Sequence, residues 1–213
     1  MHPDKDTAPG RGAPASPDGP PLRSDAQRNR ERILAVALAE LTRSADTPLS
    51  AIAKKAGVGQ GTFYRNFHHR EALILEVYRH LVQQVTDAAA RLLANRAPDG
   101  ALREWMDRLA RFAMAEAGLA EALGSAGGTP RGTLTKLGHG PLRSAVALLL
   151  RANAEAGTIR PGVTPDDFLL AVAGLWRLDR QGDWRSRARR LSDLVMDGLR
   201  AGAPGPGTRP QDD

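Results

Sequence analysis

The spacing of the apolar residues restricts this chain to helices. Through residues 22–201, apolar side chains recur every three or four positions, which is the period of a helix with one buried face. No β-branched run alternates with polar residues, no Asn-Gly pair marks a hairpin, and three Trp, two Tyr and four Phe are the only aromatic residues. We therefore expect an all-α fold of about nine helices.

Both ends of the chain differ in composition from the middle. Residues 1–22 are rich in proline and carry almost no large apolar side chain, and residues 203–213 are similarly rich in Gly and Pro. Such segments cannot bury a core, so we expect two disordered tails. Between them we expect a helical head over residues 23–80 and a larger helical domain over residues 81–202.

Two local signals predict where the first helices begin. Ser24 followed by Gln27 is a capping-box pattern, which predicts the start of the first helix. Thr47 followed by Pro48 combines a hydroxyl cap with a proline in the first turn, which predicts the start of the second.

The second half of the chain contains a predicted interruption. Residues 124–140 are rich in glycine, so we expect at most a short helix there and a new helix from Pro141 to Gly157. Thr164-Pro165-Asp166-Asp167 combines a hydroxyl cap, a proline and acidic residues, which predicts the start of a helix over about residues 165–180. The last helix is expected over about residues 183–201, where apolar side chains recur with helical spacing.

Motifs for catalysis and for cofactors are missing from the sequence. It contains no cysteine, no Gly-rich phosphate loop, no GxSxG elbow and no HExxH pair. Glu76 and His80 share a helical face, but one such pair is more often an ion pair than a metal site. We therefore expect no enzyme activity, no cofactor and no metal.

Hydropathy and cysteine usage predict the compartment. No stretch approaches the roughly 18 apolar residues of a membrane span, and the first residues lack the apolar core of a signal peptide. The absence of cysteine fits a reducing compartment. We expect a cytoplasmic protein without a membrane partner.

The positive charge is concentrated near the N-terminus. The chain carries a net charge of +6, and residues 23–80 hold ten basic and six acidic side chains. This is the largest basic excess per residue in the chain. It is typical of a segment that meets a polyanion such as nucleic acid.

Residues 48–67, PLSAIAKKAGVGQGTFYRNF, follow the pattern of a helix-turn-helix. Gly57 supplies the left-handed residue of the turn, and Val58 and Phe63 are expected to fill the angle between the two helices. The second helix then presents several polar side chains that can reach base edges or phosphates.

The longer segment IAKKAGVGQGTFYRNFHHREAL resembles the N-terminal signature of TetR-family transcriptional regulators, over about residues 24–90. The downstream run AEAGTIRPGVTPDDFLLAVAGLWRL is similar to the regulatory domain of an actinobacterial-type branch. The resemblance implies a sequence-specific DNA-binding regulator, typically a repressor that a small molecule releases from a palindromic operator. The alternative is a helical protein-interaction or scaffold domain that binds no DNA.

The motif and the resemblance together give ten candidate DNA-binding residues: Ser50, Lys54, Gln60, Gly61, Thr62, Tyr64, Arg65, Asn66, His68 and Arg70. Tyr64 and Arg70 are expected at phosphates, and Gln60 and Arg65 at base edges in the major groove. Two positions depart from the family pattern. Arg70 stands where a lysine is usual, and His69 where Ser, Thr or Asp usually caps the next helix.

The larger domain is expected to bind an apolar or aromatic effector and to form a homodimer. The candidate pocket residues are Trp105, Leu109, Phe112, His139 and Trp176, although aromatic residues on apolar stripes can also be simple core. The resemblance implies an isologous four-helix interface between two copies, built from the last two helices. Its candidate residues are Leu191, Leu194, Val195 and Leu199.

Overall fold

The computed structural model describes residues 21–125 and 130–205, and every regular element in these ranges is helical. Eight α-helices and one 3-10 helix, η1, follow one another as α1 (Pro21–Arg43), α2 (Leu49–Lys55), α3 (Gln60–Asn66), α4 (Arg70–Asn95), α5 (Pro98–Ser125), α6 (Pro130–Glu155), α7 (Pro165–Ala171), η1 (Val172–Arg177) and α8 (Trp184–Arg200). The predicted all-α fold of about nine helices is confirmed. No helix in the described ranges is long and apolar enough to cross a membrane.

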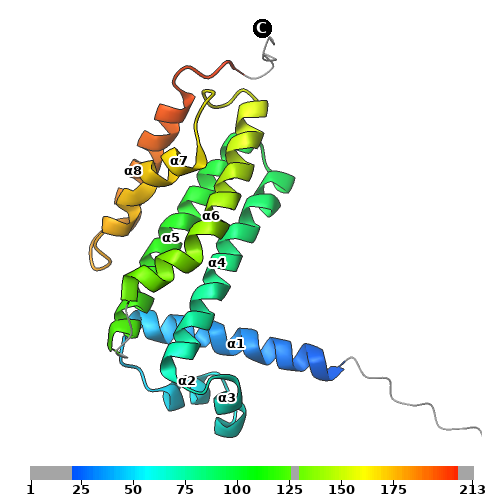
Figure 1. Ribbon diagram of the computed structural model, residues 1–213, viewed down its shortest axis with the longest axis vertical. Helices are drawn as coiled ribbons and strands as arrows, with labels where there is room; N and C mark the ends of the chain where they lie inside the picture. Colours follow the sequence, from blue (N-terminus) through cyan, green and yellow to red (C-terminus); the bar gives the residue numbers. More distant parts are fainter. Residues whose placement is uncertain (1–20, 126–129, 206–213) are drawn as a thin grey trace, which may run out of the picture.

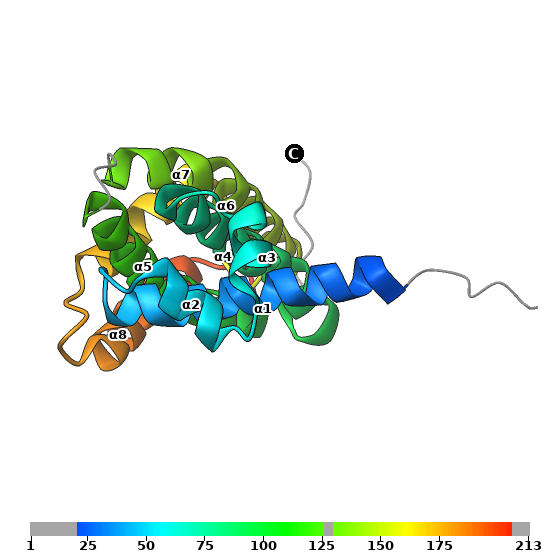
Figure 2. The same cartoon turned by 90° about the horizontal axis from the view of Figure 1, so that it is seen from below.

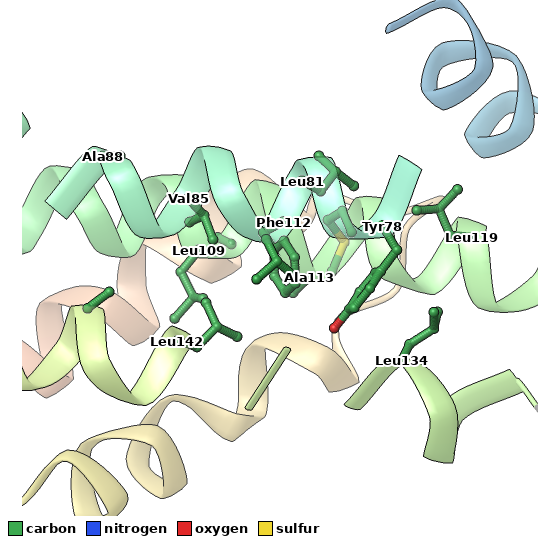
Figure 3. Close-up of a cluster of buried hydrophobic side chains, with 14 of the residues drawn as sticks. Tyr78, Leu81, Val85, Ala88, Leu109, Phe112, Ala113, Leu119, Leu134 and Leu142 are labelled. Carbon is green, nitrogen blue, oxygen red and sulfur yellow. The ribbon is translucent and has the colours of Figure 1, made fainter. Parts of the chain in front are cut away.

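The long helices α4, α5 and α6 lie side by side and form the body of the molecule (Figure 1). Their facing sides bury apolar residues in a continuous core, of which Tyr78, Leu109 and Phe112 are central members (Figure 3). The helices α1, α2 and α3 gather at one end of α4 (Figure 2). The predicted boundary between residues 80 and 81 falls within α4, so one helix belongs to both parts.

Two buried polar side chains tie these helices together. The Trp105 indole N–H donates to the carbonyl oxygen of Val85 at 2.8 Å, which joins α5 to α4. The Asn153 amide donates to the carbonyl oxygen of Pro98 at 2.9 Å, which joins the end of α6 to the start of α5. Buried donors of this kind need partners, so both contacts restrict how the helices can be placed.

The starts of α1 and α2 differ from the predictions. Helix α1 begins at Pro21, three residues before Ser24, so the predicted start at Ser24 is wrong. Pro48 is the N-cap of α2 and no side chain caps this helix; the Thr47 hydroxyl instead donates to the carbonyl oxygen of Ser44 at 2.9 Å. The predicted tails lie mostly outside the described residues, which include 21–22 within α1 and 203–205 near the C-terminus.

The predicted interruption before Pro141 is also wrong for the part of it that is described. Helix α6 runs without a break from Pro130 through Gly138, Gly140 and Pro141, while residues 126–129 lie outside the described ranges. The reason is packing. Gly138 is buried against α4, and the Tyr78 hydroxyl occupies the position that a β-carbon on Gly138 would take. This glycine therefore serves close helix contact rather than a turn.

The later helices follow the local signals more closely. Thr164 and Asp167 form a complete capping box at the start of α7, and Asp183 caps α8 through the backbone N–H of Ser186. The helix expected over residues 165–180 is divided, because the α-helical part ends at Ala171 and continues as η1.

We predict that Gly138→Ala destabilises the protein by about 1–3 kcal/mol, because the new methyl group displaces the Tyr78 ring from a packed core. Gly100→Ala is the control, since a β-carbon there meets no atom within 4 Å and a helical alanine is favoured by about 0.5–1 kcal/mol. Urea denaturation of both variants measures the difference. Equal midpoints would contradict the assigned role of Gly138.

Candidate functional site

Helices α2 and α3 form the predicted helix-turn-helix. Gly57 adopts φ +65°, the left-handed conformation that the turn requires. The backbone N–H of Val58 donates to the carbonyl oxygen of Ala53 at 3.1 Å, which closes the turn. Ala53 and Phe63 are completely buried, so the two helices are fixed relative to each other through their inner faces.

The outer face of α3 is polar and exposed. Phe63 and Phe67 point into the head, whereas Gln60, Arg65 and Asn66 are exposed to solvent. Their backbone is regular helix, so these side chains project from a rigid support. A short exposed polar helix held on two buried aromatic residues can be presented to a groove of DNA without rearrangement.

The ten predicted residues come from α2, α3, the start of α4 and, for His68, the segment between α3 and α4, at the lower end of the molecule in Figure 1. Eight of them are exposed: Ser50, Lys54, Gln60, Gly61, Tyr64, Arg65, Asn66 and His68. Thr62 and Arg70 are half-buried. The Thr62 hydroxyl accepts a hydrogen bond from Arg65 at 3.0 Å, and His68 Nδ1 lies 2.7 Å from the carbonyl oxygen of Tyr64.

Arg70 contacts the protein's own backbone. Its guanidinium donates to the carbonyl oxygen of Thr47 at 2.7 Å and to that of Ala45, so it fastens the start of α4 to the loop between α1 and α2. The next residue back, His69, caps α4 by accepting a hydrogen bond from the Ala72 N–H at 3.2 Å. Arg70 therefore shapes the head from inside, and its contact with phosphate stays a prediction.

A buried carboxylate that the sequence interpretation missed stabilises the head. Glu40 of α1 is 6% exposed and accepts hydrogen bonds from Lys55 of α2 and from Arg43, both at 2.6 Å. These two bonds, that of Lys55 first, hold the pKa of Glu40 below its ordinary value. The signal was present in the sequence as an acidic residue beside the apolar stripe of α1, between Ala37 and Leu41.

We predict that Glu40→Gln lowers the stability of the protein at pH 7 and flattens its dependence on acid pH. Because the pKa of Glu40 is depressed on folding, its contribution is present above the unfolded-state pKa of about 4.3 and is lost as the pH falls through the folded-state pKa. Thermal denaturation from pH 7 to pH 3 measures this. Glu31→Gln, at an exposed position of the same helix, is the control and should retain the wild-type profile.

A cavity of about 560 Å³ opens in the body between α4, α5, α6, α7 and η1. Its wall is mostly apolar and includes Ala117, Ala120, Leu142, Leu169, Leu170, Ala173 and Trp176. Of the five predicted pocket residues, His139 and Trp176 line it. Trp105, Leu109 and Phe112 do not, because they are buried in the core behind the wall, with Phe112 packed edge-on against Trp176.

The cavity also holds polar groups that the sequence interpretation did not identify. The Trp176 indole N–H donates to the buried Glu116 carboxylate at 2.8 Å. Burial raises the pKa of the Tyr78 phenol, and the charge of Glu116 raises it further, so this hydroxyl stays protonated. At the rim, a hydrogen bond from Arg143 lowers the pKa of Asp166. These residues lie on five helical elements, α4, α5, α6, α7 and η1, so no local sequence pattern connects them.

Two large apolar side chains on α7 and α8 are exposed. Leu170 of α7, in the cavity wall, is 77% exposed and Leu194 of α8 is 71% exposed, which is unusual for large apolar side chains in the described part of the chain. Leu191 and Val195 are half-buried beside Leu194 on α8. Leu199 differs from the other predicted interface residues because it is buried within its own subunit.

Comparisons with known proteins agree with this architecture. Residues 33–77 match the family described as bacterial regulatory proteins, tetR family, and residues 97–201 match the C-terminal domain described as transcriptional regulator SbtR-like. The crystal structure of the TetR transcriptional regulator SCO0520 from Streptomyces coelicolor is 40% identical, with a TM-score of 0.70 over 84% of this chain and 99% of that one. The chain belongs to the TetR family.

Other solved TetR regulators share the fold. The regulator from Mycobacterium vanbaalenii is 33% identical, with a TM-score of 0.69 over 84% of this chain and 99% of that one. The repressor FadR of Thermus thermophilus, solved with lauroyl-CoA, is 26% identical, with a TM-score of 0.51 over 84% of this chain and all of that one. None of the curated proteins matches the sequence.

Membership in the TetR family defines the general activity of this chain. It is a DNA-binding transcriptional regulator, from a class of transcription factors that are not enzymes. Its helix-turn-helix lies within the segment that matches the tetR family, and its body from residue 97 onward matches the SbtR-like C-terminal domain.

Proposed function

We propose that this TetR regulator represses transcription as a homodimer on a palindromic operator and is released when an apolar or aromatic effector enters the cavity. The observation that carries the proposal is the exposed polar face of α3 on its buried base of Phe63 and Phe67, at one end of a helix that also reaches the cavity. We place this activity in the cytoplasm, where bacterial operators lie.

The proposed DNA contacts divide into base-reading and positioning residues. Gln60 and Arg65 carry the side-chain types that read adenine and guanine edges in the major groove. Tyr64, Ser50 and Asn66 are suited to sugar and phosphate contacts, which position the head without reading sequence. The remaining candidates in and beside α3 are Lys54, Gly61, Thr62, His68 and Arg70.

Gly61 is informative because nothing inside the protein requires it. A β-carbon at this position meets no atom within 4 Å, and the residue lies within a helix, where glycine is unfavourable relative to alanine. Its lack of a side chain therefore has no explanation in the packing of the free head. We propose that it allows the backbone of α3 to approach the DNA closely.

We predict that Gly61→Ala stabilises the protein by about 0.5–1 kcal/mol and weakens operator binding roughly tenfold or more. Fluorescence anisotropy with DNA from upstream of the protein's own gene measures the affinity, and thermal denaturation measures the stability. Gly100→Ala, which is equally open but lies in the body, should gain stability and bind DNA as the wild type does.

Two results would contradict the proposal. If Gly61→Ala binds as tightly as the wild type, α3 does not approach the DNA in the proposed register. The wild-type protein could also bind DNA from upstream of its own gene no more tightly than random DNA at moderate salt. That result would favour the helical protein-interaction alternative instead.

The cavity supports the effector part of the proposal. Its apolar wall and the Trp176 ring suit an apolar or aromatic compound, while His139 and Glu116 provide a few polar groups that can orient it. FadR was solved with lauroyl-CoA, and the structurally similar LfrR from Mycobacterium smegmatis with proflavine. We propose that this chain uses its cavity in the corresponding way, with a ligand of its own.

Helix α4 can transmit the presence of the effector to the head. It starts at Arg70, which holds the loop before α2, and it carries Tyr78 in the cavity wall. An effector shifts DNA affinity only if it binds one position of this helix better than another.

The exposed apolar face of α8 supports the proposed homodimer. Leu194 is large and exposed, and Leu191 and Val195 are half-buried beside it, so burying this face against the same face of a second copy removes apolar area from water on both subunits. One helix-turn-helix contacts too few bases for useful specificity, whereas two heads on a twofold axis read a palindrome.

We predict that Leu194→Glu makes the protein monomeric at micromolar concentration, because each subunit would bury an unpaired carboxylate in the apolar interface. Light scattering after size-exclusion chromatography measures the mass. Leu137→Glu, at an exposed position of α6, should remain dimeric. A wild-type protein that is monomeric and still binds its operator would refute the dimeric form of the proposal.

A further inference from the structure

The cavity wall continues directly into a loop that contacts the DNA-binding head. Trp176 of η1 lines the cavity, and Arg180 follows it in the loop before α8. The Arg180 guanidinium donates to the carbonyl oxygen of Thr42 at 2.6 Å and to the Glu121 carboxylate of α5 at 3.1 Å. The chain therefore connects the cavity to the end of α1 within a few residues.

The carbonyl oxygen of Thr42, which accepts the hydrogen bond from Arg180, needs a donor from outside α1. Thr42 lies in the last turn of α1, where the backbone carbonyls have no partner within the helix and carry its partial negative charge. A guanidinium is well suited to bind them. The chain then enters the loop that leads to α2, and Arg70 holds this loop through the carbonyl oxygens of Ala45 and Thr47.

Little space remains where Arg180 meets α1. A β-carbon on Gly118 of α5 would lie 3.0 Å from the Thr42 α-carbon and 3.1 Å from the Arg180 guanidinium. The side chain of Arg180 is only 27% exposed. Because α1, α5 and the loop are in close contact here, a shift of the loop along α5 cannot leave the Thr42 contact unchanged.

The two elements that hold Arg180 against Thr42 both line the cavity: η1, which leads into the Arg180 loop, and α5, which carries Glu121. Trp176 donates to Glu116 of α5 across the cavity wall, and Ala117 and Ala120 of the same helix line the cavity next to Glu121. An occupant that separates η1 from α5 therefore acts on the loop and on the helix that together hold Arg180.

We infer that Arg180 is a positioning residue for the DNA-binding head and that it transmits occupancy of the cavity to the end of α1, alongside the route through α4. The inference rests on the proposed function, because it assigns a second connection between the two proposed sites. It identifies one side chain whose contact differs between the cavity-empty and cavity-occupied states.

Amide hydrogen exchange of residues 38–47 tests the inference without DNA or effector. Arg180→Met removes every donor but keeps most of the length of the side chain, and it should speed exchange in this segment while residues 105–113 of the core stay protected. Arg180→Lys should restore part of the protection. Arg189→Met, which removes a charge from an exposed position of α8, is the matched control and should behave as wild type.

A double-mutant cycle tests the connection to the cavity. Trp176→Phe removes the hydrogen bond to Glu116 and keeps an aromatic ring, so it should also speed exchange over residues 38–47. The same change in the Arg180→Met background should add nothing, because the connection is already broken. Additive effects, or no effect of either variant, would overturn the inference. If Arg180→Met does not fold, Gly118→Ala opens the same contact sterically and should give the same exchange pattern.

Operator binding provides a separate measurement. Arg180→Met should weaken binding roughly tenfold, as expected for the loss of a charge-assisted hydrogen bond that positions the head, and Arg189→Met should not. If the wild-type protein binds no operator, the proposed function fails, while the exchange experiment still decides whether Arg180 positions the end of α1.

Discussion

One uninterrupted apolar stripe along α4 joins the two parts of this protein. The buried side of this helix extends from Leu73 and Ile74, near the head, to Leu92 in the body. The helix packs against α1 at one end and against α5 and α6 along the rest of its length. Since a helix keeps its hydrogen bonds throughout, it moves as a rod, and a displacement at one end reaches the other.

Hydrogen bonds from two arginines to backbone carbonyl oxygens also determine the position of the DNA-binding head. Arg70, at the start of α4, binds carbonyl oxygens in the loop between α1 and α2, and Arg180, in the loop before α8, binds one at the end of α1. Carbonyls at the end of a helix are present whatever the side chains are, so these contacts determine the position of the backbone. The orientation of α3 therefore depends on residues that lie outside the helix-turn-helix, as well as on the packing of Phe63.

The parts of the structure that could be predicted from the sequence are those governed by local chemistry. Gly57 predicted the turn because few other residues adopt its backbone conformation cheaply, and Thr164 followed by Pro165 and two aspartates predicted a helix start, where the structure forms a capping box. The continuity of α6 through Gly138 could not be predicted, because it depends on Tyr78 of another helix. The partners of Arg70 and Arg180 could not be predicted either, because they are backbone carbonyl oxygens, and these are present at every residue whatever its side chain.

The wall of the cavity has a consequence for how this protein can diversify. The side supplied by α7 and η1 includes Leu170, which is 77% exposed, whereas Leu109 and Ala113 in the core behind the opposite side are fully buried. Substitutions on the α7 side change the shape of the cavity with little loss of buried area, so they cost little folding stability. Ligand preference can therefore change during evolution through substitutions on this side of the cavity, while the helical framework and the helix-turn-helix stay the same.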